Sequence, residues 1–250
     1  MQDSHEYHIT FPFAILKRNI FTMMISLQFL VGLLLGTALG WLIFWTAKID
    51  STLPYFAGKK LLPPTKSKFQ PVVFVGIGGV VGLVFALNAW FFGENLQLVY
   101  FQVMSFLLLS VALYDLAFRV IPIILIGGVV GVSFLCVLLF DLPMSFWPSL
   151  YGGLTVGGLV LFMYLLTRGR GIGEADIFIA LVIGFLFGWS KGLVVFSAAN
   201  VLGLIVMLPL MALLGRERTK YIPLAFFLSI AIFLQWYFLY AERILSLLHL

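Results

Sequence analysis

The chain has 250 residues, of which 62% are hydrophobic and 10% are charged, and 26 of them are phenylalanine. No soluble domain hides this much apolar surface in one core, so the composition predicts a polytopic membrane protein. The net charge of +5 comes from Lys and Arg scattered among loops, which argues against a nucleic-acid-binding face. The single cysteine, Cys136, lies in an apolar run and the three histidines lie near the termini, which argues against a metal site.

Apolar segments of bilayer-crossing length occupy most of the chain. Residues 1–20 are mixed in character and have no cleavage site after an apolar core, so we interpret them as a non-cytoplasmic N-terminal segment rather than a signal peptide. A first span is expected at 21–45, before a loop at 46–70 that its prolines keep from being helical. Seven further spans are expected at 71–92, 98–115, 119–140, 148–167, 175–190, 192–214 and 221–241. The pattern predicts an all-α protein with about eight transmembrane helices in a single domain, 21–250, in which the sixth and seventh spans are joined tightly.

The basic residues predict the orientation of these spans. If the lysine-rich loop 46–70 is cytoplasmic, eleven Lys and Arg residues fall on the cytoplasmic side, namely Lys48, Lys59, Lys60, Lys66, Lys68, Arg119, Arg168, Arg170, Arg216, Arg218 and Lys220. Four fall on the other side, namely Lys17, Arg18, Lys191 and Arg243. Because cytoplasmic loops carry the excess of basic residues, both termini are predicted to be non-cytoplasmic.

Two carboxylates lie at the predicted boundary of the membrane. Asp115 ends the third span and Asp176 begins the sixth, so both fall at the cytoplasmic edge. An acidic side chain costs about 2.5–3.5 kcal/mol at the centre of a membrane helix and less near its end, so each calls for a reason. A structural interpretation exists for each: Asp115 paired with Arg119 four positions later, and Asp176 bound to the free N–H groups at a helix start. Their shared side of the membrane favours a functional interpretation.

A pair of carboxylates around one water is equipped for peptide hydrolysis. The two cannot both ionise comfortably, so one keeps its proton while the other stays charged. The charged one takes a proton from water as the water attacks a peptide carbonyl, and the protonated one donates to the developing oxyanion. The two roles then reverse to protonate the leaving amine. No cofactor is needed for this proteolysis.

Two short motifs contain the aspartates, namely YDLAFRVIP at 114–122 and GIGEAD at 171–176. The first is similar to the Asp-Leu-Arg-x-x-x-Ile-Pro element of the type IV prepilin peptidases, and the second resembles the Gly-x-Gly-x-Gly-Asp motif of that family. Gly184, Gly188 and the pair 222–223 match later elements of that family, so the resemblance runs from about 20 to 240. It implies an aspartyl protease of the bacterial inner membrane whose catalytic dyad is Asp115 and Asp176. Residues expected near the dyad as support are Arg119, Pro122, Gly171, Gly173, Glu174 and Ala175.

The resemblance also implies a substrate and a partner. The family removes the short basic leader of prepilin-like proteins at the cytoplasmic face, between a glycine and the first hydrophobic residue, while the apolar helix of the substrate lies in the lipid bilayer. Bifunctional members carry two Cys-x-x-Cys pairs in the loop that corresponds to 46–70 and N-methylate the product with S-adenosylmethionine. The present loop has no cysteine. Methylation stays open, because some members lack these cysteines, and the sequence does not address the oligomeric state.

Two local departures from the family motif fall next to Asp176. Ala175 stands where a glycine is usual, which is harmless if that position is helical and awkward if it needs a positive φ. Phe178 replaces a lysine, but two residues along a helix points to roughly the opposite face, so the carboxylate does not lose a partner by this change.

Two other functions remain as alternatives. Tyr114-Asp115 is also compatible with a protease of the presenilin or signal-peptide-peptidase type, although the Ile-Pro pair after Arg119 favours the prepilin family. In a transporter or a non-catalytic pilus-assembly protein, the two aspartates would instead carry ions or brace helices. Exchanging each Asp for Asn separates these cases, because only a protease would lose cleavage of a prepilin.

Glycines and tryptophans are expected in structural roles. Gly153 with Gly157, and the glycines at 78, 79, 82, 127, 128 and 131, are predicted to form close helix-packing faces. Trp90, Trp147, Trp189 and Trp236 fall at span ends and are predicted to lie in interfacial belts.

Overall fold

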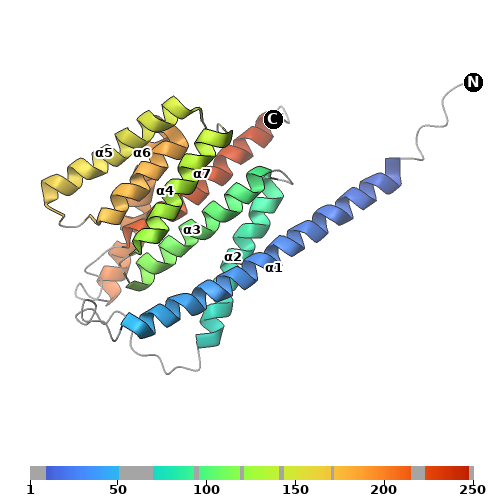
Figure 1. Ribbon diagram of the computed structural model, residues 1–250, viewed down its shortest axis with the longest axis horizontal. Helices are drawn as coiled ribbons and strands as arrows, with labels where there is room; N and C mark the ends of the chain where they lie inside the picture. Colours follow the sequence, from blue (N-terminus) through green and yellow to red (C-terminus); the bar gives the residue numbers. More distant parts are fainter. Residues whose placement is uncertain are drawn as a thin grey trace, which may run out of the picture. The chain divides into compact units, whose positions relative to one another are not determined.

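The computed structural model is helical throughout the elements it describes, which cover residues 10–50, 70–92, 96–118, 121–140, 144–169, 172–214 and 223–247. In this part of the chain the elements are α1 Thr10–Asp50, α2 Gln70–Phe92, α3 Leu96–Phe118, α4 Ile123–Phe140, α5 Phe146–Thr167, α6 Glu174–Leu214 and α7 Leu224–Leu247 (Figure 1). The contacts divide the chain into two units, Met1–Gln102 and Val103–Leu250, and each unit is described by itself.

Five of the described helices are long and apolar enough to cross a membrane: α1, α2, α3, α5 and α6. Shorter apolar stretches lie in α4 (Ile123–Leu139) and α7 (Leu224–Leu239). These helices follow the expected segments and are consistent with the predicted all-α polytopic membrane protein. The number of spans and the side of each terminus stay predictions, as does the single membrane domain.

The boundaries of α1 differ from the expected ones. The helix begins at Thr10 and continues to Asp50, so it includes residues assigned to the N-terminal segment and to the loop 46–70. The sequence argument delimits an apolar run, whereas a helical backbone continues into polar residues that make their own i to i−4 hydrogen bonds. Residues 1–9 and 51–69 lie outside the described part.

The helix α6 contains both the sixth and the seventh expected spans. Its backbone leaves helical geometry at Gly188, where φ is 73° and ψ is 179°. A Cβ added at Gly192 would lie 3.1 Å from the Cα of Gly184, whereas eight residues of straight helix would separate these positions by about 12 Å. The chain therefore turns back on itself at Gly188, and glycine suits this turn because its φ is positive.

In the first unit, α1 and α2 approach until their backbones touch. A Cβ at Gly32 would lie 2.7 Å from the Cα of Gly82, and one at Gly36 would lie 2.8 Å from the Cα of Gly78. Side chains as small as these permit close helix contact in a membrane. The predicted packing role is confirmed for Gly78 and Gly82, but not for Gly79, which has open space around it.

A buried polar cluster also lies in the first unit. Nε2 of Gln102 in α3 donates to Oε1 of Gln28 in α1 at 3.2 Å and to the carbonyl of Phe85 in α2 at 3.0 Å. Nδ2 of Asn88, which is fully buried, donates to Oε1 of Gln102 at 3.3 Å and to the carbonyl of Phe101 at 3.2 Å. Hydrogen bonds thus link three helices in a region where water is excluded.

In the second unit, α5 packs on α6 through glycine (Figure 1). A Cβ at Gly152 would meet the carbonyl oxygen of Gly184 and would lie 2.6 Å from the Cα of Gly188. A Cβ at Gly157 would lie 2.9 Å from the Cβ of Leu181, and one at Gly153 would lie 3.2 Å from the carbonyl oxygen of Leu181. The predicted packing role of Gly153 and Gly157 is confirmed.

Two structural expectations fail in the second unit. Nothing lies within 4 Å of a Cβ added at Gly127 or Gly131, so these glycines of α4 make no close contact, although Gly128 faces Leu107. Trp236 is only 5% exposed and packs on Phe187 and Phe233, whereas Trp90, Trp147 and Trp189 are exposed as a belt requires. The predicted belt position is wrong for Trp236, because the face of α7 that carries Trp236 packs against Phe187 of α6.

Candidate active site

Asp115 lies one turn before the end of α3 and is 8% exposed. Its Oδ2 accepts a hydrogen bond of 3.1 Å from the backbone N–H of Phe226, the third residue of α7. The first four N–H groups of a helix have no partner within the helix, and a carboxylate there also interacts favourably with the helix dipole. Asp115 therefore caps α7 from another helix, through a contact 111 residues apart in the chain.

Asp176 is the third residue of α6 and is 7% exposed. Its Oδ2 accepts a hydrogen bond of 2.8 Å from the backbone N–H of Gly173, and its own N–H donates to the Gly173 carbonyl at 3.1 Å. This is one half of a capping box, in which the third residue of the helix reaches back to the residue before the first. Asp176 therefore binds a backbone N–H at the start of a helix, as the structural interpretation predicts.

The two carboxylates belong to the second unit and act on each other. Burial is the largest influence on the charge of the Asp176 carboxyl, and Asp115 adds a smaller Coulombic influence. Each is held by a backbone N–H at the start of a helix, α7 for Asp115 and α6 for Asp176. Hydrolysis by a carboxylate pair needs two carboxyl groups around one water, and both carboxyl groups here are largely buried.

The turn between α5 and α6 sets the position of Asp176. Arg168 ends α5 in the left-handed conformation, with φ 53° and ψ 42°, and Gly169 follows with φ 70°. The N–H of Gly169 donates to the Tyr164 carbonyl at 2.9 Å, which closes the helix end. The Tyr164 hydroxyl then donates to Oε1 of Glu174 at 3.0 Å, across the turn.

Among the support residues expected from the sequence, four are described. Pro122 stands before α4, where its carbonyl accepts the N–H of Leu125 at 3.0 Å. Gly173 and Glu174 contact Asp176 and Tyr164 as given above. Ala175 is helical without a positive φ, so its departure from glycine costs no backbone strain. Arg119 and Gly171 lie outside the described part, and so does any pairing of Arg119 with Asp115.

Comparison with known proteins supports one family. Residues 102–208 match the model of the type IV leader peptidase family. None of the curated proteins or solved structures compared with the chain matches it. The match covers a shorter stretch than the resemblance at 20–240, and both aspartates fall inside it.

The match to the leader peptidase family over residues 102–208 supports a peptidase, and the length and composition of the apolar helices are consistent with a membrane-associated protein. The matched segment begins in α3 and ends within α6, so Phe226 of α7 lies beyond it. In the described residues, no group of three or more His, Cys, Asp and Glu side chains is arranged to hold a metal ion.

Two contacts of this candidate site could not be predicted from the sequence. Phe226 contributes only its backbone N–H to Asp115. Because almost every residue type has a backbone N–H, the identity of this residue does not indicate the contact. Tyr164 contributes its hydroxyl to Glu174, ten residues later. The single signal for the first was the pair 222–223 at the start of the last span, since a proline there marks a helix start with unpaired N–H groups.

Proposed function

We propose that the protein is a membrane aspartyl endopeptidase that removes the leader of type IV prepilin-like precursors, with Asp115 and Asp176 as its catalytic dyad. The observation that carries the proposal is the pair of largely buried carboxyl groups, each bound to a helix N-terminus and each within electrostatic reach of the other, inside a leader peptidase segment. One carboxyl activates water and the other donates to the oxyanion, and their roles exchange for departure of the amine.

The proposed setting is the cytoplasmic face of the bacterial inner membrane, with about eight spans and both termini on the other side. The distribution of basic residues supports this orientation. A substrate whose basic leader stays at that face, and whose apolar helix enters the bilayer, brings its cleavage point to the level of α3's end and α6's start. Proteolysis uses no cofactor, and S-adenosylmethionine enters only if methylation is retained.

Co-expression with a prepilin and mass spectrometry of the product test the proposal. We expect a product shortened at the junction of leader and apolar helix, and a loss of about 10²–10⁴-fold in cleavage rate for Asp115→Asn or Asp176→Asn. Asp50→Asn, at the end of α1, is the control and leaves cleavage unchanged. Full cleavage by the variant with Asn at both positions would refute the dyad, and the product mass also reports methylation.

A second candidate function rests on the contact between Asp115 and Phe226. A carboxylate that caps α7 braces two helices, as it would in a transporter or a non-catalytic assembly protein. That function predicts no cleavage of a prepilin by the unmodified protein, and, for a transporter, an ion flux in proteoliposomes that Asp115→Asn reduces.

A further inference from the structure

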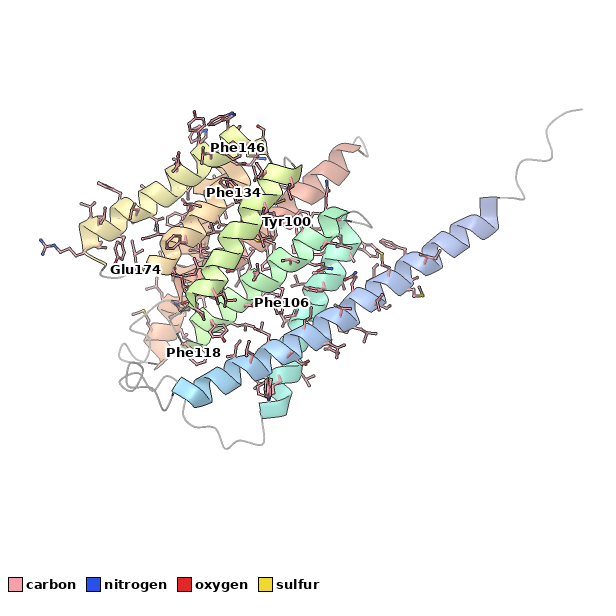
Figure 2. All side chains as sticks on the ribbon, viewed as in Figure 1. Tyr100, Phe106, Phe118, Phe134, Phe146 and Glu174 are labelled. Atoms are coloured by element: carbon pink, nitrogen blue, oxygen red, sulfur yellow. The ribbon has the colours of Figure 1, made fainter. Side chains whose placement is uncertain are left out.

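Tyr164 connects the end of α5 to the start of α6 at three points. Its carbonyl accepts the N–H of Gly169 at 2.9 Å, and its hydroxyl donates to Oε1 of Glu174 at 3.0 Å. Its ring lies against Gly169, where an added Cβ would be 3.1 Å from the ring carbon Cε2. Figure 2 labels Glu174 where α6 begins, beside the end of α5. The side chain thus spans the turn that the backbone makes.

The residue that Tyr164 holds is adjacent to the Asp176 capping contact. Glu174 is the first residue of α6 and Asp176 is the third, about 3 Å further along the helix axis. The hydrogen bonds between Gly173 and Asp176 enclose Glu174 within one turn of backbone. A rotation of this first turn therefore moves Glu174 and the Asp176 carboxyl together.

We propose that Tyr164 is a positioning residue of the peptidase site, which fixes the first turn of α6 through Glu174 and thereby orients the Asp176 carboxyl toward Asp115. The inference rests on the proposed function. In this role Tyr164 acts through Glu174. Loss of the Tyr164 contact would displace the Asp176 carboxyl slightly. Small displacements of reacting groups lower the catalytic rate more than they lower substrate affinity.

The test compares four variants of the 250-residue chain, purified in detergent, on a prepilin substrate. Tyr164→Phe removes only the hydroxyl, Glu174→Ala removes the acceptor, the double variant removes both, and Glu174→Gln keeps an amide oxygen as acceptor. Tyr151→Phe is the matched control, because Tyr151 lies exposed on the same helix. Thermal unfolding of each variant, followed by tryptophan fluorescence, reports on folding.

We expect Tyr164→Phe and Glu174→Ala each to lower kcat by about three- to tenfold with KM unchanged, the effect of one hydrogen bond to a charged group in an exposed setting. The double variant should lose no more than either single variant, because both remove the same contact. Glu174→Gln and Tyr151→Phe should keep kcat within about twofold. A general loss of folding would not produce this pattern of non-additivity and rescue.

Each contrary result has a defined meaning. Equal kcat for Tyr164→Phe and Tyr151→Phe, additive losses in the double variant, or a change confined to KM would overturn the positioning role. If Tyr164→Phe unfolds at a lower temperature, the comparison of Glu174→Ala with Glu174→Gln decides, and equal kcat for these two overturns the role. Absence of cleavage by the unmodified protein, or its persistence in Asp176→Asn, overturns the proposed function instead, so the two failures are distinguishable.

Discussion

Replacing Gly152 by alanine tests the close contact between α5 and α6. The new Cβ would meet the Gly184 carbonyl oxygen and the Gly188 Cα, the latter at 2.6 Å. Real Cβ atoms essentially never approach other heavy atoms this closely, and both neighbours are backbone atoms that no change of rotamer can move away. The two helices must therefore separate, which loosens their packing along α6.

The magnitude follows from a matched substitution on the same helix. Gly158→Ala adds the same methyl group to α5 at a position where nothing lies within 4 Å. Both substitutions gain the same helix propensity, about 0.5–1 kcal/mol, so this gain cancels in their difference. The difference that remains is the cost of overpacking, typically about 1–3 kcal/mol. We expect Gly152→Ala to be less stable than Gly158→Ala by that amount.

The assay is unfolding of the purified variants in mixed micelles, with intrinsic tryptophan fluorescence as the signal. Gly158→Ala should unfold at the same denaturant concentration as the unmodified protein or a higher one, and Gly152→Ala at a lower one. Equal stability of the two alanine variants would show that α5 and α6 do not approach at Gly152.

Two further predictions address the other helix contacts. Phe226→Pro removes the N–H that donates to Asp115 and should lower kcat/KM by about tenfold or more, while Phe226→Ala keeps this donor and should retain most activity; equal kinetics would contradict the contact. Proline at the third position of a helix is compatible with this fold, because Pro148 occupies that position in α5. Gln102→Leu removes hydrogen bonds to α1 and α2 and should lower the free energy of unfolding by about 1–2 kcal/mol, measured against Gln97→Leu, an exposed position of the same helix; equal unfolding would show that the cluster adds no stability.

Helix content and the ends that carry the aspartates could be predicted from the sequence. Long uncharged runs specify membrane helices because backbone groups in lipid must be satisfied within the segment. The polar interruption before Asp176 then had to be a turn, and Asp176 had to begin a helix. The joint between the sixth and seventh segments was also expected, and the structure assigns the change of direction to Gly188.

The contacts between helices could not be predicted in the same way. A proline before α7 indicates unpaired N–H groups, but it does not say which carboxylate binds them, and the partner lies 111 residues earlier. Glycine spacing likewise indicates a face of small residues without its partner: Gly152 meets α6, whereas Gly127 and Gly131 meet nothing within 4 Å. Local patterns encode which groups need partners, and tertiary packing decides which partners they find.

The two interpretations of the aspartates, as helix caps and as a catalytic pair, differ in what each requires of the side chain. A cap needs only an acceptor oxygen, and the side-chain amide of asparagine supplies one for the N–H of Phe226 or of Gly173. Acid–base chemistry needs a carboxyl group that gains and loses a proton, which asparagine cannot do. Asparagine at either position therefore preserves the brace and removes the chemistry, whereas alanine removes both. If an asparagine variant folds like the unmodified protein but does not cleave, the carboxyl groups act in catalysis. If it still cleaves, they serve only as helix caps.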